Sequence, residues 1–300
     1  MNGLILIDKP KNYTSFDVVA IMRKLCKQKK VGHTGTLDPV ATGVLPILIG
    51  NATKAQSLIP NHDKEYIAKF RLGVITDTQD VTGNIISNKK FNVAKKDLIN
   101  VLEEFKGEIF QVPPMYSAIK KDGKKLYELA RLGMEVERAA RKVKIYSLFL
   151  VAFNDITGEG ELRVGCSEGT YIRTLCNDIG NRLGCGAVMT ELRRTFACGF
   201  SIDNCITIDE ARQMSQNNAL STKFISTDNL FNIYDAISIT TNQSIRFKNG
   251  GCLDLSRISI SNMVNDGAIF RVYNPESIFI GLGKVSKEFN SLLIYKLFLN

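Results

Sequence analysis

One carboxylate stands out in the stretch GHTGTLDPVATG, which spans residues 32–43. The stretch is rich in glycine and threonine, and its single acid is Asp38. Because Asp38 precedes a proline, its backbone is driven towards an extended conformation, and the side chain should project from a rigid loop. Such a carboxylate could serve as a nucleophile, but Asp and Pro are also ordinary turn formers. The spacing alone favours a turn residue.

Other kinds of site find little support in the sequence. The loop is not followed by Gly-Lys-Ser/Thr and lacks the Gly-x-Gly-x-x-Gly spacing, which argues against kinases and dehydrogenases. No second acid lies near Asp38 in sequence, so a two-carboxylate glycosidase is not evident. The chain has two histidines and seven cysteines without a Cys-x-x-Cys pair. We therefore expect reduced thiols and no metal site.

The charge of the chain favours a polyanionic partner. Its 300 residues carry a formal net charge of +9 and a pI near 9.1. Residues 118–146 are the most basic segment, and tyrosines lie within and beside it, a pattern compatible with an RNA groove. A solvated helix with i,i+4 pairs such as Lys124 and Glu128 explains the same spacing equally well. Both interpretations stay open at this point.

Hydrophobic periodicity predicts the elements that must position Asp38. Helices are expected at 16–28 after an N-cap at Ser15, after Asn92, after the turn at Gly169, and from the cap Thr207. Strands are expected at 2–7, 64–73, 144–153, 161–167 and 187–195. From about Tyr234, short alternating runs separated by turn signals are typical of a small β-barrel or sandwich.

Nothing in the sequence predicts a membrane segment or a signal peptide. The opening residues MNGLILIDKP have no basic region before their apolar run, and the stretch VLPILI is far shorter than the roughly 18 residues that span a bilayer. We therefore expect a soluble, cytoplasmic protein.

Four separated segments together resemble one known family. DKPKNYTS at 8–15, GHTGTLDPVATG at 32–43, GTYIRTL at 169–175 and LRRT at 192–195 are similar, in order and separation, to the motifs of the bacterial tRNA pseudouridine-55 synthases. The resemblance implies an α+β fold with a mixed, largely antiparallel sheet flanked by helices. It implies a catalytic domain at 1–232, with a tRNA-gripping insertion at about 118–146, and a PUA-like RNA-binding β-barrel at 233–300.

The resemblance also implies an activity. Such enzymes isomerise uridine 55 in the tRNA T-loop to pseudouridine, using base flipping, an essential aspartate and neither cofactor nor metal. It makes Asp38 the catalytic residue, with Arg173 pairing with it. The resemblance implies four further active-site positions. Tyr66 would stack on the uracil, Tyr171 and Leu192 would line its pocket, and Lys9 belongs to the first motif. The positions expected to contact RNA are His33, Lys120, Lys121, Lys124, Lys125, Arg131, Arg141 and Lys142.

The sequence departs from the family motif at one position and leaves two other functions open. Asn12 stands where glycine is usual, and asparagine tolerates the left-handed backbone that this turn needs. Because the first strand begins almost at once, we expect an enzyme that acts on the T-arm without guide RNA. We also expect a monomer. The alternatives are a protein that grips tRNA or assists its folding without chemistry, and a synthase that acts on another RNA.

Overall fold

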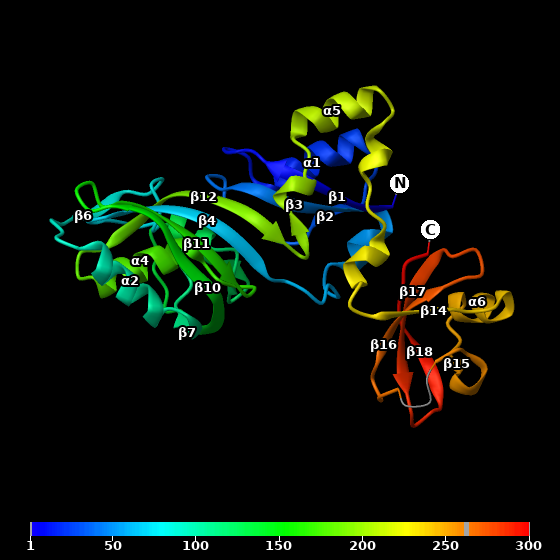
Figure 1. Ribbon diagram of the computed structural model, residues 1–300. Helices are drawn as coiled ribbons and strands as arrows, with labels where there is room; N and C mark the ends of the chain where they lie inside the picture. Colours follow the sequence, from blue (N-terminus) through cyan, green and yellow to red (C-terminus); the bar gives the residue numbers. More distant parts are fainter. Residues whose placement is uncertain (1, 261–263, 300) are drawn as a thin grey trace.

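A nine-stranded mixed sheet forms the centre of the first domain in the computed structural model, which describes residues 2–260 and 264–299 (Figure 1). Its neighbours are antiparallel except β12 and β3, which confirms the mixed, largely antiparallel sheet. The main path follows β1 (Gly3–Lys9), β3 (Thr42–Ile49), β12 (Ala187–Ala197), β4 (Lys64–Leu72), β11 (Glu159–Cys166), β10 (Arg141–Asn154) and β7 (Gly107–Gln111), with β2 (Val31–His33) paired to β3 and β13 (Phe200–Ser201) to β12.

Strand β1 is buried on both faces. Ile5 and Ile7 pack with α1 (Ser15–Leu25) and α5 (Ile208–Gln216), while Leu4 and Leu6 point to the opposite side. Successive side chains of a strand face opposite ways, so a strand covered on both sides needs an uninterrupted apolar run. The sequence GLILI meets this need.

Strand β4 carries the alternation expected for a half-buried strand. Its residues Tyr66, Ala68, Phe70 and Leu72 are all at most 6% exposed. They pack in one core with residues of α2 (Lys95–Glu104) and α4 (Ile172–Arg182). The sheet centre is therefore rigid at Tyr66.

Two predicted helix caps were wrong, and one helix was missed. Thr14, not Ser15, caps α1 through a capping box with Asp17. Ala94, not Asn92, occupies the cap position of α2. Helix α6 (Thr241–Lys248) follows a capping box of Thr240 and Gln243, a sequence signal for a helix start. The cap predicted at Thr207 is confirmed.

The basic segment folds as a hairpin and one short helix rather than one long helix. Strands β8 (Lys120–Lys121) and β9 (Lys124–Lys125) pair, and α3 (Leu126–Arg131) follows. Lys124 lies in a strand, so the interpretation as a helix with a Lys124–Glu128 pair was wrong. A small core of Met115, Leu126 and Leu129 holds the segment together and leaves most of its basic side chains exposed.

The C-terminal part forms a separate five-stranded sheet with its own core. The sheet order is β14 (Asp235–Ser238), β16 (Ile269–Tyr273), β17 (Phe279–Ser286), β18 (Ser291–Leu297) and β15 (Leu253–Asp254). This sheet, with α6 beside it, is consistent with the predicted small β-barrel (Figure 1). One further core joins Leu4 and Leu6 of β1 to Phe231, Leu282 and Phe298, so the two parts share a buried apolar contact.

One more pair of strands belongs to the first domain. Strands β5 (Val74–Thr76) and β6 (Ile85–Asn88) form a hairpin after β4.

Within the described ranges, no helix is both long and apolar enough to cross a membrane.

We expect Gly43→Ala to destabilise the protein strongly. Gly43 has a φ of +107°, and a Cβ there would lie 2.1 Å from the backbone oxygen of Arg194 on β12. Backbone strain alone costs about 1–3 kcal/mol, and the clash would also separate β3 from β12. Chemical denaturation should therefore show a loss of more than about 3 kcal/mol in the free energy of unfolding.

Gly133→Ala is the matched control. Gly133 has a φ of +71°, but no described atom lies within 4 Å of a Cβ there. This variant should lose about 1 kcal/mol from backbone strain alone. Equal losses in the two variants would contradict the role given to the β3–β12 approach.

Candidate active site

Two motifs that lie 135 residues apart meet at Asp38. Nη2 of Arg173 lies 3.3 Å from Oδ1 and 3.2 Å from Oδ2 of Asp38. Arg173 belongs to the first turn of α4, which follows a left-handed turn at Gly169. The Arg173 side chain is 6% exposed and that of Asp38 is 33% exposed. The guanidinium therefore supports the carboxylate from inside while the carboxylate remains open to a ligand.

Asp38 also begins a tight turn. Its carbonyl oxygen accepts a hydrogen bond from the backbone N–H of Ala41 at 3.0 Å, across Pro39 and Val40. Leu37 and Ala41, on either side, are buried in the same core as Tyr66. The backbone of Asp38 makes the turn and leaves its side chain free for Arg173, so a turn residue and a site residue are compatible descriptions.

The first motif holds the Asp38 loop in place. The Ser15 hydroxyl accepts a hydrogen bond from the N–H of Leu37 at 2.8 Å and donates one to its carbonyl at 3.2 Å. Asn12 has the expected left-handed backbone, with a φ of 68°, and its N–H donates to the carbonyl of Pro39 at 2.8 Å. The loop is thus clamped on both sides of Asp38, and the Ser15 clamp was not foreseen from the sequence.

A second carboxylate, Asp80, was missed. Its Oδ2 lies 3.6 Å from Nη1 of Arg173, and its side chain is 4% exposed. Its Oδ1 accepts hydrogen bonds from the Thr78 hydroxyl and from the N–H of Thr82, both at 2.9 Å. Arg173 therefore bridges two carboxylates, one buried and one accessible. The segment DTQDVTG around Asp80 has the composition of an ordinary turn, so the sequence carried no signal for this role.

Burial and three neighbouring charges act on the pKa of Asp38 in opposing directions. Burial raises its pKa, the Arg173 guanidinium opposes that rise, the negative charge of Asp80 adds to it, and Lys9 opposes it again. Lys9 is fully buried, and its Nζ donates to the carbonyls of Pro10 at 3.0 Å and Tyr13 at 2.7 Å. Burial lowers the pKa of Lys9 to about 8. Lys9 thus bonds to the backbone of the first motif, and its positive charge acts on the Asp38 carboxylate.

Apolar side chains form a floor beside Asp38. Tyr66 and Leu192, on the adjacent strands β4 and β12, are 6% and 8% exposed and share a core with Leu37. Burial raises the pKa of Tyr66 to about 12, so its phenol is neutral at pH 7. The backbone N–H and carbonyl of Tyr171 bond to the buried amide of Gln111 at 2.8 and 3.1 Å.

His33 is the last residue of β2. Its side chain is partly buried, and burial lowers its pKa, with Arg194 acting in the same direction. The imidazole is therefore uncharged at pH 7, which suits contact with the flat face of a base better than contact with a phosphate.

The predicted RNA-contacting cations lie on the hairpin β8–β9, on α3 and at the start of β10. The carbonyl of Tyr116 accepts a 2.7 Å hydrogen bond from Nη2 of Arg173 and so connects the hairpin to the site. Lys142 pairs with Glu108 at 2.8 Å. The exposed members are Lys120, Lys121, Lys124, Arg131, Arg141 and Lys142, and Lys125 is partly buried.

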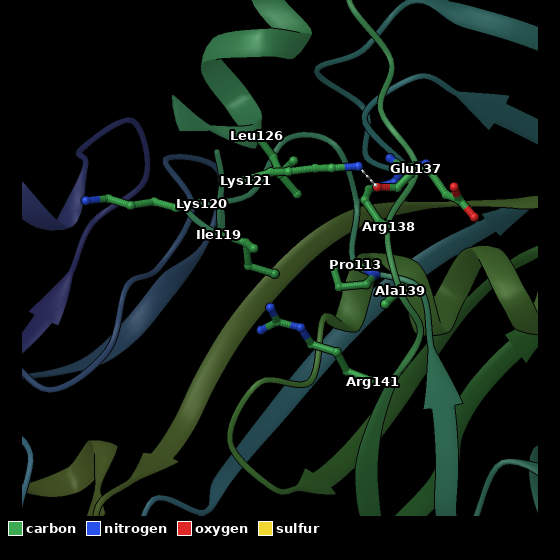
Figure 2. Close-up of a pocket in the computed structure, with 9 residues that line it drawn as sticks. All are labelled: Pro113, Ile119, Lys120, Lys121, Leu126, Glu137, Arg138, Ala139 and Arg141. Carbon is green, nitrogen blue, oxygen red and sulfur yellow. Dashed lines mark hydrogen bonds between the residues drawn. The ribbon is translucent and has the colours of Figure 1, made fainter. Parts of the chain in front are cut away.

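A pocket of about 380 Å³ lies beside this hairpin (Figure 2). Lys120, Lys121 and Arg141 line part of it, and Nζ of Lys121 donates to the carbonyl of Glu137 at 2.8 Å. Asp38 is not among its lining residues. Among the residues the structure describes, no three His, Cys, Asp or Glu side chains lie close enough together to hold a metal ion.

Comparison with known proteins matches both parts of the first domain. The sequence profile of the TruB family pseudouridylate synthase N-terminal domain matches residues 23–172, and that of the tRNA pseudouridylate synthase B C-terminal domain matches 173–227. The tRNA pseudouridine synthase B of Clostridium tetani is 46% identical over 96% of this chain and 97% of its own length. That of Clostridium acetobutylicum is 42% identical with the same coverage of both chains.

Solved structures confirm the predicted fold class. A Cbf5-Nop10-Gar1 complex contains a chain with a TM-score of 0.73 and 27% identity, covering 99% of this chain and 85% of that chain. A chain of the archaeal box H/ACA sRNP Nop10-Cbf5 complex has the same TM-score at 23% identity, covering 99% and 86%, which supports the fold alone.

The two carboxylates bonded to Arg173 should respond oppositely to amide substitution. Asp80→Asn removes the charge of a buried, fully bonded partner, so we expect thermal and chemical unfolding at pH 7 to show a loss of about 2 kcal/mol. Asp38→Asn should raise stability, because it removes a partly desolvated charge.

The pH dependence of the Asp38→Asn effect has a definite sign. A carboxyl whose pKa is raised in the folded state destabilises that state above the pKa of the unfolded chain, and the cost vanishes below it. The stability gain of Asp38→Asn over the natural protein should therefore be largest near pH 7 and disappear towards pH 4. A gain that grows as the pH falls would contradict the electrostatic description.

Proposed function

Because the chain belongs to the TruB family of pseudouridylate synthases, we propose that it isomerises a uridine of tRNA to pseudouridine, and that its target is uridine 55 in the T-loop. Curated relatives named tRNA pseudouridine synthase B align with this chain over nearly the full length of both, which supports tRNA as the substrate. The position within the T-loop rests on the resemblance of the four motifs.

Asp38 is the proposed catalytic residue. The reaction breaks the bond between N1 of uracil and C1′ of ribose, rotates the base and joins C5 to C1′ within the same nucleotide. Asp38 would start it either by attacking C1′ or by removing a proton from C2′. Arg173 keeps this carboxylate ionised and aimed. The observation that carries the proposal is the contact of Arg173 with a partly exposed Asp38, beside the buried side chains of Leu37 and Tyr66.

The surrounding residues fit the needs of a free base. Tyr66 and Leu192 would offer the flat and apolar surfaces between which a uracil can rotate. Tyr171, at the N-cap of α4, would line the same pocket. A site that holds the detached base away from water prevents its loss. The neutral Tyr66 phenol could pass a proton at C5 without carrying a charge into the pocket.

Access to the uridine requires base flipping, at a cost of a few kcal/mol. His33, uncharged and at the head of the loop, would fill the space that the nucleotide leaves. The exposed cations of the basic hairpin would grip the T-arm phosphates. We assign catalysis to residues 1–232 and additional RNA binding to 233–300.

The proposed reaction is redox-neutral and moves no group to another molecule, so it calls for neither cofactor nor metal. We propose that the protein acts on tRNA as a monomer in the cytoplasm. Both Cbf5 neighbours were solved with Nop10, and one of them also with Gar1. The full-length agreement with relatives named for tRNA favours action without guide RNA here.

Asp38→Asn should bind a tRNA transcript with unchanged affinity and lose isomerisation by a factor of about 10⁴ or more. Carbodiimide labelling of the product under single-turnover conditions measures the rate, and filter binding measures the affinity. Asp97→Asn, at an exposed carboxylate in the first turn of α2, is the matched control and should retain full activity.

The same variant separates this function from its alternatives. Turnover that survives in Asp38→Asn would remove the catalytic assignment. A tRNA-folding assay in which Asp38→Asn performs fully would show that the protein also acts by binding alone. Pseudouridine at positions outside the T-loop in total RNA would identify a different substrate.

A further inference from the structure

Arg194 carries a buried charge without a matching acid. Its side chain is 1% exposed. Nε donates to the carbonyl of Val44 at 2.7 Å and Nη2 to that of Gly35 at 3.2 Å. Across residues 2–260 and 264–299, Nη1 has no hydrogen bond of standard geometry. The neighbouring Tyr66 hydroxyl interacts with this side chain but is neutral, and no carboxylate lies within ion-pair distance of the guanidinium. A buried charge is normally paired, so this arrangement needs an explanation.

Lys64 adds a second positive charge at the same place. A Cβ built on Gly35 would lie 3.7 Å from Cε of Lys64 and 3.8 Å from Nη1 of Arg194, so both side chains converge on this glycine. Nζ of Lys64 donates to the carbonyl of His62 at 2.8 Å, which leaves two of its three protons for other acceptors. Burial lowers the pKa of Lys64, and Arg194 lowers it further.

The acids near this pair are committed elsewhere or exposed. Glu168, the carboxylate that acts on Lys64 electrostatically, is 64% exposed and lies 3.7 Å from His62. Glu65 accepts a hydrogen bond from Thr195 and faces Arg163 at 3.7 Å. Lys64 and Arg194 thus form a half-buried positive centre that the protein itself does not neutralise.

Strand register places this centre one step from the proposed uracil pocket. In the β4–β12 pair, Ala68 lies opposite Leu192, Tyr66 opposite Arg194 and Lys64 opposite Ala197. Alternate residues of a strand share a face, so Lys64, Tyr66 and Ala68 point the same way, about 7 Å apart. A uracil beside Tyr66 and Leu192, with its ribose at Asp38, would carry its own backbone towards Lys64.

We propose that Lys64, supported by the Arg194 guanidinium behind it, is an anion site for the backbone phosphate next to the flipped uridine. A phosphate there completes the missing ion pair, and an ammonium group binds it as a point charge without demanding one geometry. The uncompensated charge in the free protein then becomes binding free energy for an extruded nucleotide. This inference rests on the proposed function, which supplies the flipped uridine.

The test couples one protein charge to one phosphate. A T-arm stem-loop RNA is made unmodified, or with a single uncharged methylphosphonate 5′ or 3′ of the target uridine. Affinity and single-turnover isomerisation are measured for the natural protein, Lys64→Gln and Lys69→Gln. Lys64 is partly exposed and is chosen because replacing the buried Arg194 could prevent folding. Lys69 lies on the opposite face of the same strand, paired with Glu191, and is the matched control.

We expect one of the two methylphosphonates to weaken binding about tenfold in the natural protein and in Lys69→Gln, but to have no effect in Lys64→Gln. Lys64→Gln should also reduce the slope of log Kd against log salt concentration by about 1. An equal methylphosphonate effect in Lys64→Gln and the natural protein would overturn the site. So would the absence of any effect in the natural protein.

The phosphate site and the proposed isomerisation can be contradicted separately. If the natural protein binds the RNA with the expected coupling but forms no pseudouridine, the phosphate site stands and the proposed function falls. If pseudouridine forms and the coupling is absent, the function stands and the phosphate site falls.

Discussion

The structure depends on one guanidinium shared between two carboxylates. Arg173 contacts the accessible Asp38, the buried Asp80 and the carbonyl of Tyr116, which come from three different parts of the chain. The buried acid, held by two threonine hydroxyls and the backbone N–H of Thr82, fixes the arginine. The arginine then fixes the reactive acid without enclosing it. A carboxylate can thereby be aimed at a ribose while remaining open on the side from which RNA must come.

Backbone contacts explain why the Asp38 loop can hold this position. Ser15 clamps Leu37, Asn12 holds Pro39, and Arg194 bonds to carbonyls at both ends of the loop. These groups all lie on or beside strands β1, β3 and β12, and the approach of β3 to β12 needs Gly43. The sheet therefore acts as the frame, and the loop is a rigid extension of it. The same sheet holds two cations, Lys64 and Arg194, whose charge no acid balances in the free protein. Unbalanced charge of this kind is typical of a site arranged for a ligand rather than for stability.

Local patterns predicted most of the frame. The apolar run of β1, the alternation of β4 and the Thr207 cap each follow from neighbouring residues, and these predictions are confirmed. Local patterns did not predict the secondary structure of the basic segment, because the i,i+4 spacing of Lys124 and Glu128 fits a helix and a hairpin alike. The meeting of Asp38 with Arg173 followed only from resemblance to a family. The contact of Asp80 with Arg173 and that of Ser15 with Leu37 were not predicted, because these partners are distant in sequence. In the sequence, Asp80 looks like part of an ordinary turn and Ser15 like an ordinary helix cap.

The most direct measurement of the central claim is a double-mutant cycle on single-turnover pseudouridine formation with Asp80→Asn and Arg173→Lys. If Asp80 acts by positioning Arg173, the two effects overlap, and the double variant should be no slower than the more damaging single variant. Binding of tRNA should be retained in all three variants. Effects of the two substitutions that multiply in the double variant would show that Asp80 and Arg173 act independently, and would contradict the shared guanidinium as the basis of the site.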